Sequence, residues 1–299
     1  MFPKRTIIQL LKTTTSGNIH NYRKYVFGHY PIQRRSMSSS SVQNLLLELR
    51  QLDVSSLCDA DKTLGSNDGD ESVIKLMNYT IQPKNHLQSG SVMAGVARTV
   101  SFTEPNDFLP VMRVLALEAK TDEVLVVDTL SSTRAVAGEI FVAEARRKGL
   151  AGIVIDGPIR DTAHLDDCSY LSSNNEGKGT ATTTTTTTTT TTMRIYATSV
   201  TPYSGTTDSP GKTQEVVVCG GIEVRPGDIV VGDDDGIIVG EASTFSKLIP
   251  IAQKIQQIES KLIAGITSSE EKSLASMTNI EEHVRHRLEG KLSNIEFRI

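Results

Sequence analysis

Two short apolar runs with a helical stretch between them constrain the fold of this chain more than any other feature. The runs are residues 123–128 (EVLVVD) and 152–156 (GIVID), and both have the β-branched composition of strands that are buried on both faces. Residues 134–148 lie between them, have helical composition, and are followed by Gly149, a residue type that commonly ends helices. This order of elements predicts a right-handed crossover between two parallel strands, and therefore an α/β fold.

The flanking sequence predicts further elements around this βαβ unit. Apolar residues recur every three or four positions in residues 45–65, and Gly65 is expected to stop that helix. The DDDG sequence at residues 233–236 predicts a hairpin turn. The other expected elements are a strand at 91–102, a helix at 108–119 that begins near Pro110, strands at 215–219, 228–232 and 237–239, and an amphipathic helix at 243–263.

The first 40 residues resemble a targeting signal rather than part of a fold. No Asp or Glu occurs in the first 47 residues, whereas Lys, Arg, Ser and Thr are frequent, and residues 6–12 (TIIQLLK) could form a short amphipathic turn. This composition is typical of a mitochondrial transit peptide, so we expect mitochondrial localisation. The alternatives are a disordered tail and a shorter cytoplasmic form that starts at Met37.

Beyond this leader, residues 41–265 are expected to form one catalytic domain, followed by a charged tail at 266–299 that is helical or frayed. Residues 172–192 contain a long run of threonine and cannot bury an apolar core. We therefore expect this segment to be a disordered insertion in the domain.

Composition excludes several classes of function. The formal net charge of −4 includes the basic leader, so the body of the chain is more acidic, which argues against nucleic acid as a partner. No apolar run approaches the roughly 20 residues that a helix needs to cross a membrane, so no membrane partner is expected. Cys58, Cys168 and Cys219 are widely spaced, which predicts free thiols rather than a disulfide framework or a zinc site.

Residues suited to binding a small anion follow the two predicted parallel strands. In a βαβ unit the carboxyl ends of both strands lie at one edge of the sheet, so the loop after Asp128 and the loop at 157–161 (GPIRD) should converge there. If the helix begins near Ala137, its first amides have no partner within the helix and can hold a carboxylate. Gly138 would let the ligand approach the backbone closely.

Arg160 and Asp161 add two chemically useful groups to the same edge. The planar guanidinium of Arg160 can bind a carboxylate or a keto oxygen, and Asp161 offers a hard oxygen ligand for Mg²⁺ or Mn²⁺. One Arg and one Asp are not a specific metal signature. The residues alone therefore leave open that the two side chains pair with each other or cap a turn.

The stretch AVAGEIFVAEARRKGLAGIVIDGPIRD, together with CGGIEVRPGDIVVGDDDGIIV further on, closely resembles the RraA-like family. That family includes class II 4-hydroxy-4-methyl-2-oxoglutarate aldolases and the regulator of ribonuclease activity A. Its most specific element here is Gly138 followed, after 21 residues, by Arg160 and Asp161. The resemblance implies a β/α sandwich related to swivelling domains, assembled as a homotrimer or a hexamer.

The resemblance also implies roles for individual residues. The backbone amides of Gly138, Glu139, Ile140 and Phe141 would bind the pyruvate portion of a 2-oxo acid substrate. Arg160 would bind substrate and act in catalysis, and Asp161 would hold a divalent cation, Mg²⁺ or Mn²⁺, largely through water. The implied activity is a metal-dependent aldolase that cleaves its substrate through a pyruvate enolate and also decarboxylates oxaloacetate.

One departure from the aldolase pattern keeps a second function open. The aldolases carry an acid three residues after the Arg-Asp pair, whereas this chain has His164 there. His164 could support a metal-bound water or be a surface loop histidine, and Asp166 or Asp167 could replace the missing carboxylate after a shift. The alternative function is a non-catalytic binding protein that regulates a partner enzyme, as in the ribonuclease regulator.

Two other groups of ligand-type residues are expected to be structural. Asp233, Asp234 and Asp235 resemble a metal cluster, but their context favours a hairpin turn. His283 and His286 lie three residues apart in a helical stretch and are expected on its surface.

Overall fold

The computed structural model describes residues 38–68, 73–85, 90–166, 193–268 and 273–297. Ser38–Ile299 form one compact unit, and the description below concerns this unit. The predicted leader lies outside the described residues except for residues 38–40, and the predicted insertion at 172–192 lies outside them entirely. None of the helices in the described ranges combines the length and the hydrophobicity needed to cross a membrane.

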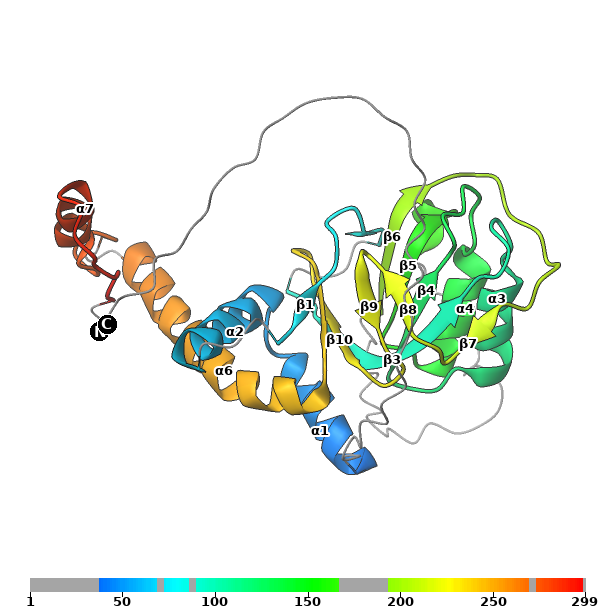
Figure 1. The fold of residues 1–299 in the computed structure, drawn as a ribbon, viewed down its shortest axis with the longest axis horizontal. Helices are drawn as coiled ribbons and strands as arrows, with labels where there is room; N and C mark the ends of the chain where they lie inside the picture. Colours follow the sequence, from blue (N-terminus) through cyan, green and yellow to red (C-terminus); the bar gives the residue numbers. More distant parts are fainter. Residues whose placement is uncertain (1–37, 69–72, 86–89, 167–192, 269–272, 298–299) are drawn as a thin grey trace, which may run out of the picture. The chain divides into compact units, whose positions relative to one another are not determined.

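A mixed nine-stranded sheet forms the centre of the fold (Figure 1). Its strands follow the order β1-β11-β10-β3-β4-β5-β6-β2, with β7 paired to β3. The four central strands β3, β4, β5 and β6 run parallel, and β10 and β11 extend the sheet as an antiparallel hairpin. The strands are β1 Lys75–Leu76, β2 Gln82–Pro83, β3 Met93–Ser101, β4 Glu123–Asp128, β5 Gly152–Ile159, β6 Arg194–Val200, β7 Lys212–Thr213, β10 Ile229–Gly232 and β11 Ile237–Gly240.

Helices cover one face of this sheet and a small hairpin covers the other. On the helical face, α1, α2 and α6 pack on the β3–β10–β11 end, whereas α3 and α4 pack on β4, β5 and β6. The opposite face packs against β8 and β9, which form a separate two-stranded sheet. These elements are α1 Ser39–Leu49, α2 Val54–Asp68, α3 Leu109–Arg113, the π-helical turn η1 Val114–Glu118, α4 Glu139–Lys148, the short 3₁₀ turn η2 Thr162–His164, β8 Val217–Cys219, β9 Ile222–Val224, α6 Ala242–Thr267 and α7 Ile280–Leu288.

The predicted βαβ unit is confirmed. β4 and β5 pair in parallel with Val126 opposite Val154, and the side chains between their ends are buried on both faces of the sheet. The connecting helix α4 ends at Gly149, which adopts the left-handed conformation with a φ of 74°. The predicted α/β class with a parallel βαβ core unit is therefore confirmed.

The start of α4 corrects the prediction that residues 134–148 form a helix beginning near Ala137. The helix begins at Glu139, and the preceding residues are extended because neighbouring loops bind their backbone. The Ala135 amide donates to the Tyr203 carbonyl at 2.8 Å, and the Val136 amide donates to the Pro158 carbonyl at 3.1 Å. These bonds compete with helix formation, so helical composition at these positions is overridden by tertiary contacts.

Several other boundaries also differ from the prediction. The helix expected at 45–65 is two helices, because the chain turns after Leu49 and Asp53 accepts a 2.6 Å hydrogen bond from the Ser56 amide near the start of α2. Gly65 does not stop α2, which continues to Asp68. Strands β1, β2, β6, β7 and β9 were not predicted, and the charged tail contains α7. The DDDG hairpin is confirmed by the bond from the Asp233 amide to the Gly236 carbonyl at 3.0 Å.

Gly95 in β3 marks a point where the sheet tolerates no side chain. An added Cβ would lie 2.6 Å from the Asp122 carbonyl oxygen and 2.9 Å from the Ala151 Cβ. We expect Gly95→Ala to lower the free energy of unfolding by about 1–3 kcal/mol, measured by urea denaturation. Gly236→Ala is the control because the nearest atom to its added Cβ is 3.7 Å away. Equal losses in the two variants would contradict this prediction.

Candidate active site

Three loops meet at the carboxyl edge of the parallel strands, as the βαβ pattern predicted. The loop after β4 crosses this edge in an extended conformation before α4 begins, and it runs beside the segment that follows β6. It also pairs with the end of β5, since the Arg160 amide donates to the Ala137 carbonyl at 3.0 Å. This pairing brings Gly138 next to Arg160 and Asp161, although 21 residues separate the two parts of the motif in the sequence.

Gly138 is required by the closeness of these two side chains. Its φ of −163° is ordinary extended backbone, so its conformation alone does not demand glycine. A Cβ at this position would lie 2.5 Å from Asp161 Oδ2 and 2.9 Å from Arg160 Cγ. The absence of a Cβ at Gly138 therefore lets the side chains of Arg160 and Asp161 lie close to the start of α4.

Asp161 is held in a left-handed backbone conformation, with a φ of 59° and a ψ of 33°. Asp is among the few non-glycine residues that adopt this conformation without a large penalty. Unfavourable backbone conformations of this kind concentrate at functional sites, where the surrounding contacts maintain them. The conformation turns the Asp161 carboxylate back towards the start of α4, where Oδ2 lies 3.4 Å from the Glu139 amide nitrogen.

Arg160 and Asp161 also contact each other, at 3.3 Å between Nε and Oδ2. The side chains are 40% and 38% exposed, respectively, and the pairing uses a single long contact rather than a two-pronged one. Such solvent-exposed ion pairs contribute little to stability. The interpretation that the two residues pair is thus confirmed, and the pairing is weak enough for a ligand to replace it.

The start of α4 retains two backbone donors that have no hydrogen-bond partner among the described residues. The Glu139 amide faces Asp161, and the amides of Phe141 and Val142 both donate to the Gly138 carbonyl at 3.1 Å. The amides of Gly138 and Ile140 make no hydrogen bond to any described residue. Of the four residues in the motif, these two therefore have the amides that are free to meet an incoming carboxylate.

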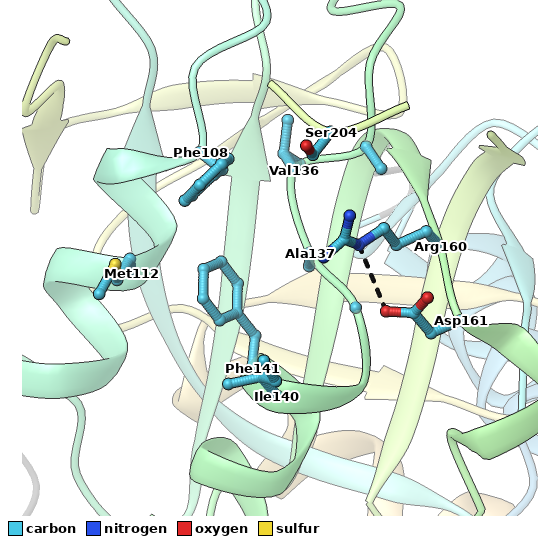
Figure 2. Close-up of a pocket in the computed structure, with 11 residues that line it drawn as sticks. Phe108, Met112, Val136, Ala137, Ile140, Phe141, Arg160, Asp161 and Ser204 are labelled. Carbon is cyan, nitrogen blue, oxygen red and sulfur yellow. Dashed lines mark ion pairs between the residues drawn. The ribbon is translucent and has the colours of Figure 1, made fainter. Parts of the chain in front are cut away.

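These residues line a cavity of about 240 Å³. Figure 2 shows Arg160 and Asp161 on one side of it and Phe108, Phe141 and Met112 on the other. A cavity of this size suits a small acid rather than a dinucleotide. Its lining residues are Phe108, Met112, Ala135, Val136, Ala137, Gly138, Ile140, Phe141, Arg160, Asp161 and Ser204. Glu139 contributes its backbone to this region but its side chain is not part of the lining.

Sequence reasoning missed Phe108, the contact of the Phe141 ring with it, and the residue that holds the loops, since Phe141 was expected to act only through its backbone amide. Phe108 and Phe141 meet edge to face with ring centroids 5.8 Å apart, although they lie in different helical regions. Asn106 adopts a φ of 65°, and its Oδ1 accepts the Thr133 amide at 2.7 Å and the Arg134 amide at 3.0 Å. The only sequence signal for these residues was the turn-forming Pro-Asn-Asp at 105–107.

The other candidate residues lie apart from the cavity. His164 is exposed on η2 and is not part of the lining, Asp166 is also exposed, and Asp167 lies outside the described residues. In the described ranges, no group of three or more His, Cys, Asp or Glu side chains is arranged to hold a metal. His283 shares a 3.0 Å hydrogen bond with Ser293, and His286 lies near Glu282 in α7.

The acidic hairpin at 233–235 lies at the opposite, amino edge of the parallel strands and has structural partners. Asp233 Oδ2 accepts the Val54 amide at 2.8 Å, and burial raises the pKa of the Asp233 carboxyl. Asp234 pairs with the fully buried Arg194 at 2.6 Å, and this hydrogen bond lowers the pKa of Asp234. The predicted hairpin turn is therefore confirmed.

The model of the RraA-like family, described as Aldolase/RraA, matches residues 54–183 and 184–239. This chain belongs to the RraA-like family. The matched residues include all of the βαβ unit and the Gly138, Arg160 and Asp161 positions around the cavity. The resemblance seen in the sequence is thereby confirmed.

Three relatives show which members of the family this RraA-like chain resembles. It is 29% identical over 181 residues to a Halalkalibacterium halodurans protein named "Putative 4-hydroxy-4-methyl-2-oxoglutarate aldolase", covering 60% of this chain and 73% of the relative. A protein of the same name from Cupriavidus necator is 31% identical over 150 residues, covering 50% and 74%. The structure of Streptomyces coelicolor RraAS2, described as an unusual member of the RNase ES inhibitor RraA family, is 26% identical with a TM-score of 0.54, covering 73% and 94%.

Asn106 should control the order of the loops around this RraA-like cavity. We expect Asn106→Ala to lower the free energy of unfolding by about 1–2 kcal/mol, because alanine loses the Oδ1 acceptor and disfavours positive φ. Hydrogen exchange of the Thr133 and Arg134 amides should become faster. Asn106→Asp retains both the acceptor and the tolerance of positive φ, and should exchange at nearly the original rate. Unchanged exchange in Asn106→Ala would show that the loops are held by other contacts.

Proposed function

We propose that this chain is a divalent-metal-dependent lyase that releases pyruvate from 4-hydroxy-2-oxo acids of the 4-hydroxy-4-methyl-2-oxoglutarate type and also decarboxylates oxaloacetate. The observation that carries the proposal is the convergence of Arg160, Asp161 and the start of α4 on one small cavity. A guanidinium, a carboxylate and a free amide together provide what a 2-oxo acid and a cation require. The names of the relatives from two bacteria support the same class of reaction.

The residues present fit a divalent cation held at Asp161. Mg²⁺ is commonly bound by only one or two protein carboxylates together with substrate oxygens and water. The Asp161 carboxylate lines the cavity, is 38% exposed, and has only two long contacts, at 3.3 Å and 3.4 Å, among the described residues. A bound cation would act as a Lewis acid and lower the energy of negative charge that develops on the keto oxygen.

The protein's own groups would bind and orient the substrate. The Ile140 amide and the positive end of α4 meet the carboxylate of the pyruvate portion. Arg160, once released from Asp161, places its guanidinium beside the keto oxygen, where charge accumulates as the enolate forms. The absence of a side chain on Gly138 keeps Arg160 and Asp161 close enough to α4 for both interactions at once.

The bond changes follow from this arrangement. The bond between C3 and C4 breaks, its electron pair remains on the pyruvate portion as an enolate, and the C4 hydroxyl loses its proton to water as C4 becomes a carbonyl carbon. C3 then takes up a proton, which gives the methyl group of pyruvate. With oxaloacetate the same enolate forms when CO₂ leaves from C4, so no lysine adduct is needed.

One observation favours a second candidate, a non-catalytic regulator of a partner enzyme. Among the described residues that line the cavity, Asp161 is the only carboxylate, and the position three residues later is the exposed His164. The similarity to RraAS2, described as a member of an RNase ES inhibitor family, points in the same direction. Pyruvate release separates the two functions.

Asp161→Asn should lower pyruvate release by about 10²–10³-fold, because it removes the anionic ligand while keeping the left-handed backbone accessible. The assay couples pyruvate to lactate dehydrogenase, with oxaloacetate or 4-hydroxy-4-methyl-2-oxoglutarate and Mg²⁺ or Mn²⁺. Asp59→Asn, in α2, is the control and should have unchanged activity. Release by the unaltered protein no faster than the metal alone would exclude the lyase and favour the regulator.

Gly138→Ala should reduce kcat/KM by about tenfold or more while leaving the melting temperature nearly unchanged. The added Cβ would push the flexible ends of Asp161 and Arg160 away from α4, and it creates no backbone strain at a φ of −163°. Gly236→Ala serves as the matched control. Full activity in Gly138→Ala would show that the position of these side chains relative to α4 does not matter for the reaction.

A further inference from the structure

The proposed substrate carries a second carboxylate, attached to C4, and this group needs a counter-charge of its own. Among the described residues that line the cavity, Arg160 is the only cation, and the pyruvate portion already requires it. A carboxylate that enters a cavity without a partner loses hydration and gains nothing in return. A second cation at the edge of the cavity would meet this requirement.

The two ends of the cavity differ in the groups that they present. Asp161 and the Ile140 amide lie at the end where the pyruvate portion is proposed to bind. In Figure 2, Ser204 and Phe108 lie at the other end. A substrate whose C1 carboxylate meets the start of α4 therefore extends C4 and the second carboxylate towards the end that contains Ser204.

A hydrogen bond joins Ser204 to a cation outside the lining. Arg134 Nη1 donates to the Ser204 carbonyl at 3.4 Å, and the adjacent residue, Ala135, forms an isolated parallel bridge with Ser204. Both Ala135 and Ser204 line the cavity, whereas Arg134 does not. The Arg134 guanidinium consequently lies just outside the lining, at the end of the cavity to which Ser204 belongs.

The backbone of Arg134 is fixed, but its side chain is available. The Arg134 amide donates to Asn106 Oδ1 at 3.0 Å, and the Ala135 amide donates to the Tyr203 carbonyl at 2.8 Å. Arg134 is exposed, and the long bond to Ser204 is the one hydrogen bond that its guanidinium makes to the described residues. A bond of this length is weak, so a carboxylate can replace it and use the planar fork of the guanidinium.

The apolar part of the lining leaves the second carboxylate to these polar residues. Phe108 and Phe141 meet edge to face with ring centroids 5.8 Å apart, and Met112 also lines the cavity. Such a surface suits the methyl group at C4 but does not suit a carboxylate. Ser204 instead adds a hydroxyl to the lining, and a hydroxyl can donate to a carboxylate.

We propose that Arg134 selects substrates with a carboxylate on C4 by pairing its guanidinium with that carboxylate, and that the Ser204 hydroxyl donates to the same group. This inference rests on the proposed lyase function and assigns its selectivity for diacids. When the bond between C3 and C4 breaks, the paired carboxylate stays with C4 in the carbonyl product. Because the carboxylate is remote from the developing enolate, the pairing contributes to binding and changes KM more than kcat.

The test compares 4-hydroxy-4-methyl-2-oxoglutarate with 4-hydroxy-4-methyl-2-oxopentanoate, in which a methyl group replaces the second carboxylate. The diacid yields two pyruvates and the analogue yields pyruvate and acetone, so rates are expressed per molecule of substrate. We expect the unaltered protein to prefer the diacid by about tenfold or more in kcat/KM. Arg134→Gln should lower this preference about tenfold, mainly through KM, and Arg134→Lys should retain part of it because the charge remains.

Two controls accompany these variants. Arg225→Gln removes the same charge from an exposed residue that makes a 3.9 Å contact with Glu223 and lies outside the cavity lining, and it should leave the preference unchanged. Decarboxylation of oxaloacetate should stay within about twofold in Arg134→Gln, because its second carboxylate lies one bond closer to the keto group and leaves as CO₂. An undiminished preference in Arg134→Gln, or an equal loss in Arg225→Gln, would overturn the role of Arg134.

A separate measurement distinguishes failure of this inference from failure of the proposed function. Exchange of the pyruvate methyl hydrogens with deuterium from solvent, in the presence of Mg²⁺ or Mn²⁺, reports enolate formation without any group at C4. Absence of both exchange and cleavage would overturn the lyase function and this inference with it. Exchange and cleavage without a preference for the diacid in the unaltered protein would overturn the inference alone.

Discussion

The parallel pairing of β4 and β5 is the interaction on which the rest of the structure depends. Because the two strands point the same way, the chain must return across the sheet through α4, and the ends of both strands open on one edge. The segment before α4 then pairs with the end of β5, where the Val136 amide donates to Pro158, and with the next residue, where the Arg160 amide donates to Ala137. The sheet therefore positions the backbone of the site, and the site's side chains extend from residues at the edge of the sheet.

The elements that could be predicted from the sequence are those that depend on residues close together in the chain. Buried β-branched runs predict β4 and β5, and Gly149 predicts the end of α4, because each depends on residues adjacent in sequence. The start of α4 was not predictable, since Ala135 and Val136 are bound by carbonyls from distant segments. Strand β6 follows the threonine run, and its pairing depends on β5 rather than on a strong pattern of its own.

The candidate site likewise contains residues that could be predicted from the sequence and residues that could not. Gly138, Arg160 and Asp161 were identifiable because the βαβ unit brings the two loops that carry them to one edge of the sheet, and because their spacing resembles that of the RraA-like family. The residues that shape the remainder of the cavity come from other parts of the chain and carry no motif. Phe108 lies immediately before α3 and Met112 lies in this helix, whereas Ser204 lies in the segment after β6. The polar residues of the cavity could thus be predicted from the sequence, whereas its apolar side required the three-dimensional structure.

The left-handed conformation of Asp161 connects function with folding stability. Glycine would occupy this position with less strain, because the backbone conformation is one that a Cβ disfavours. Nothing in the described packing requires a carboxylate at this exposed position, where its contacts are long and weak. Stability alone would therefore favour the loss of Asp161 over time. Replacement of Asp161 by glycine would therefore preserve the turn of the loop and remove only the side chain that the proposed lyase activity needs.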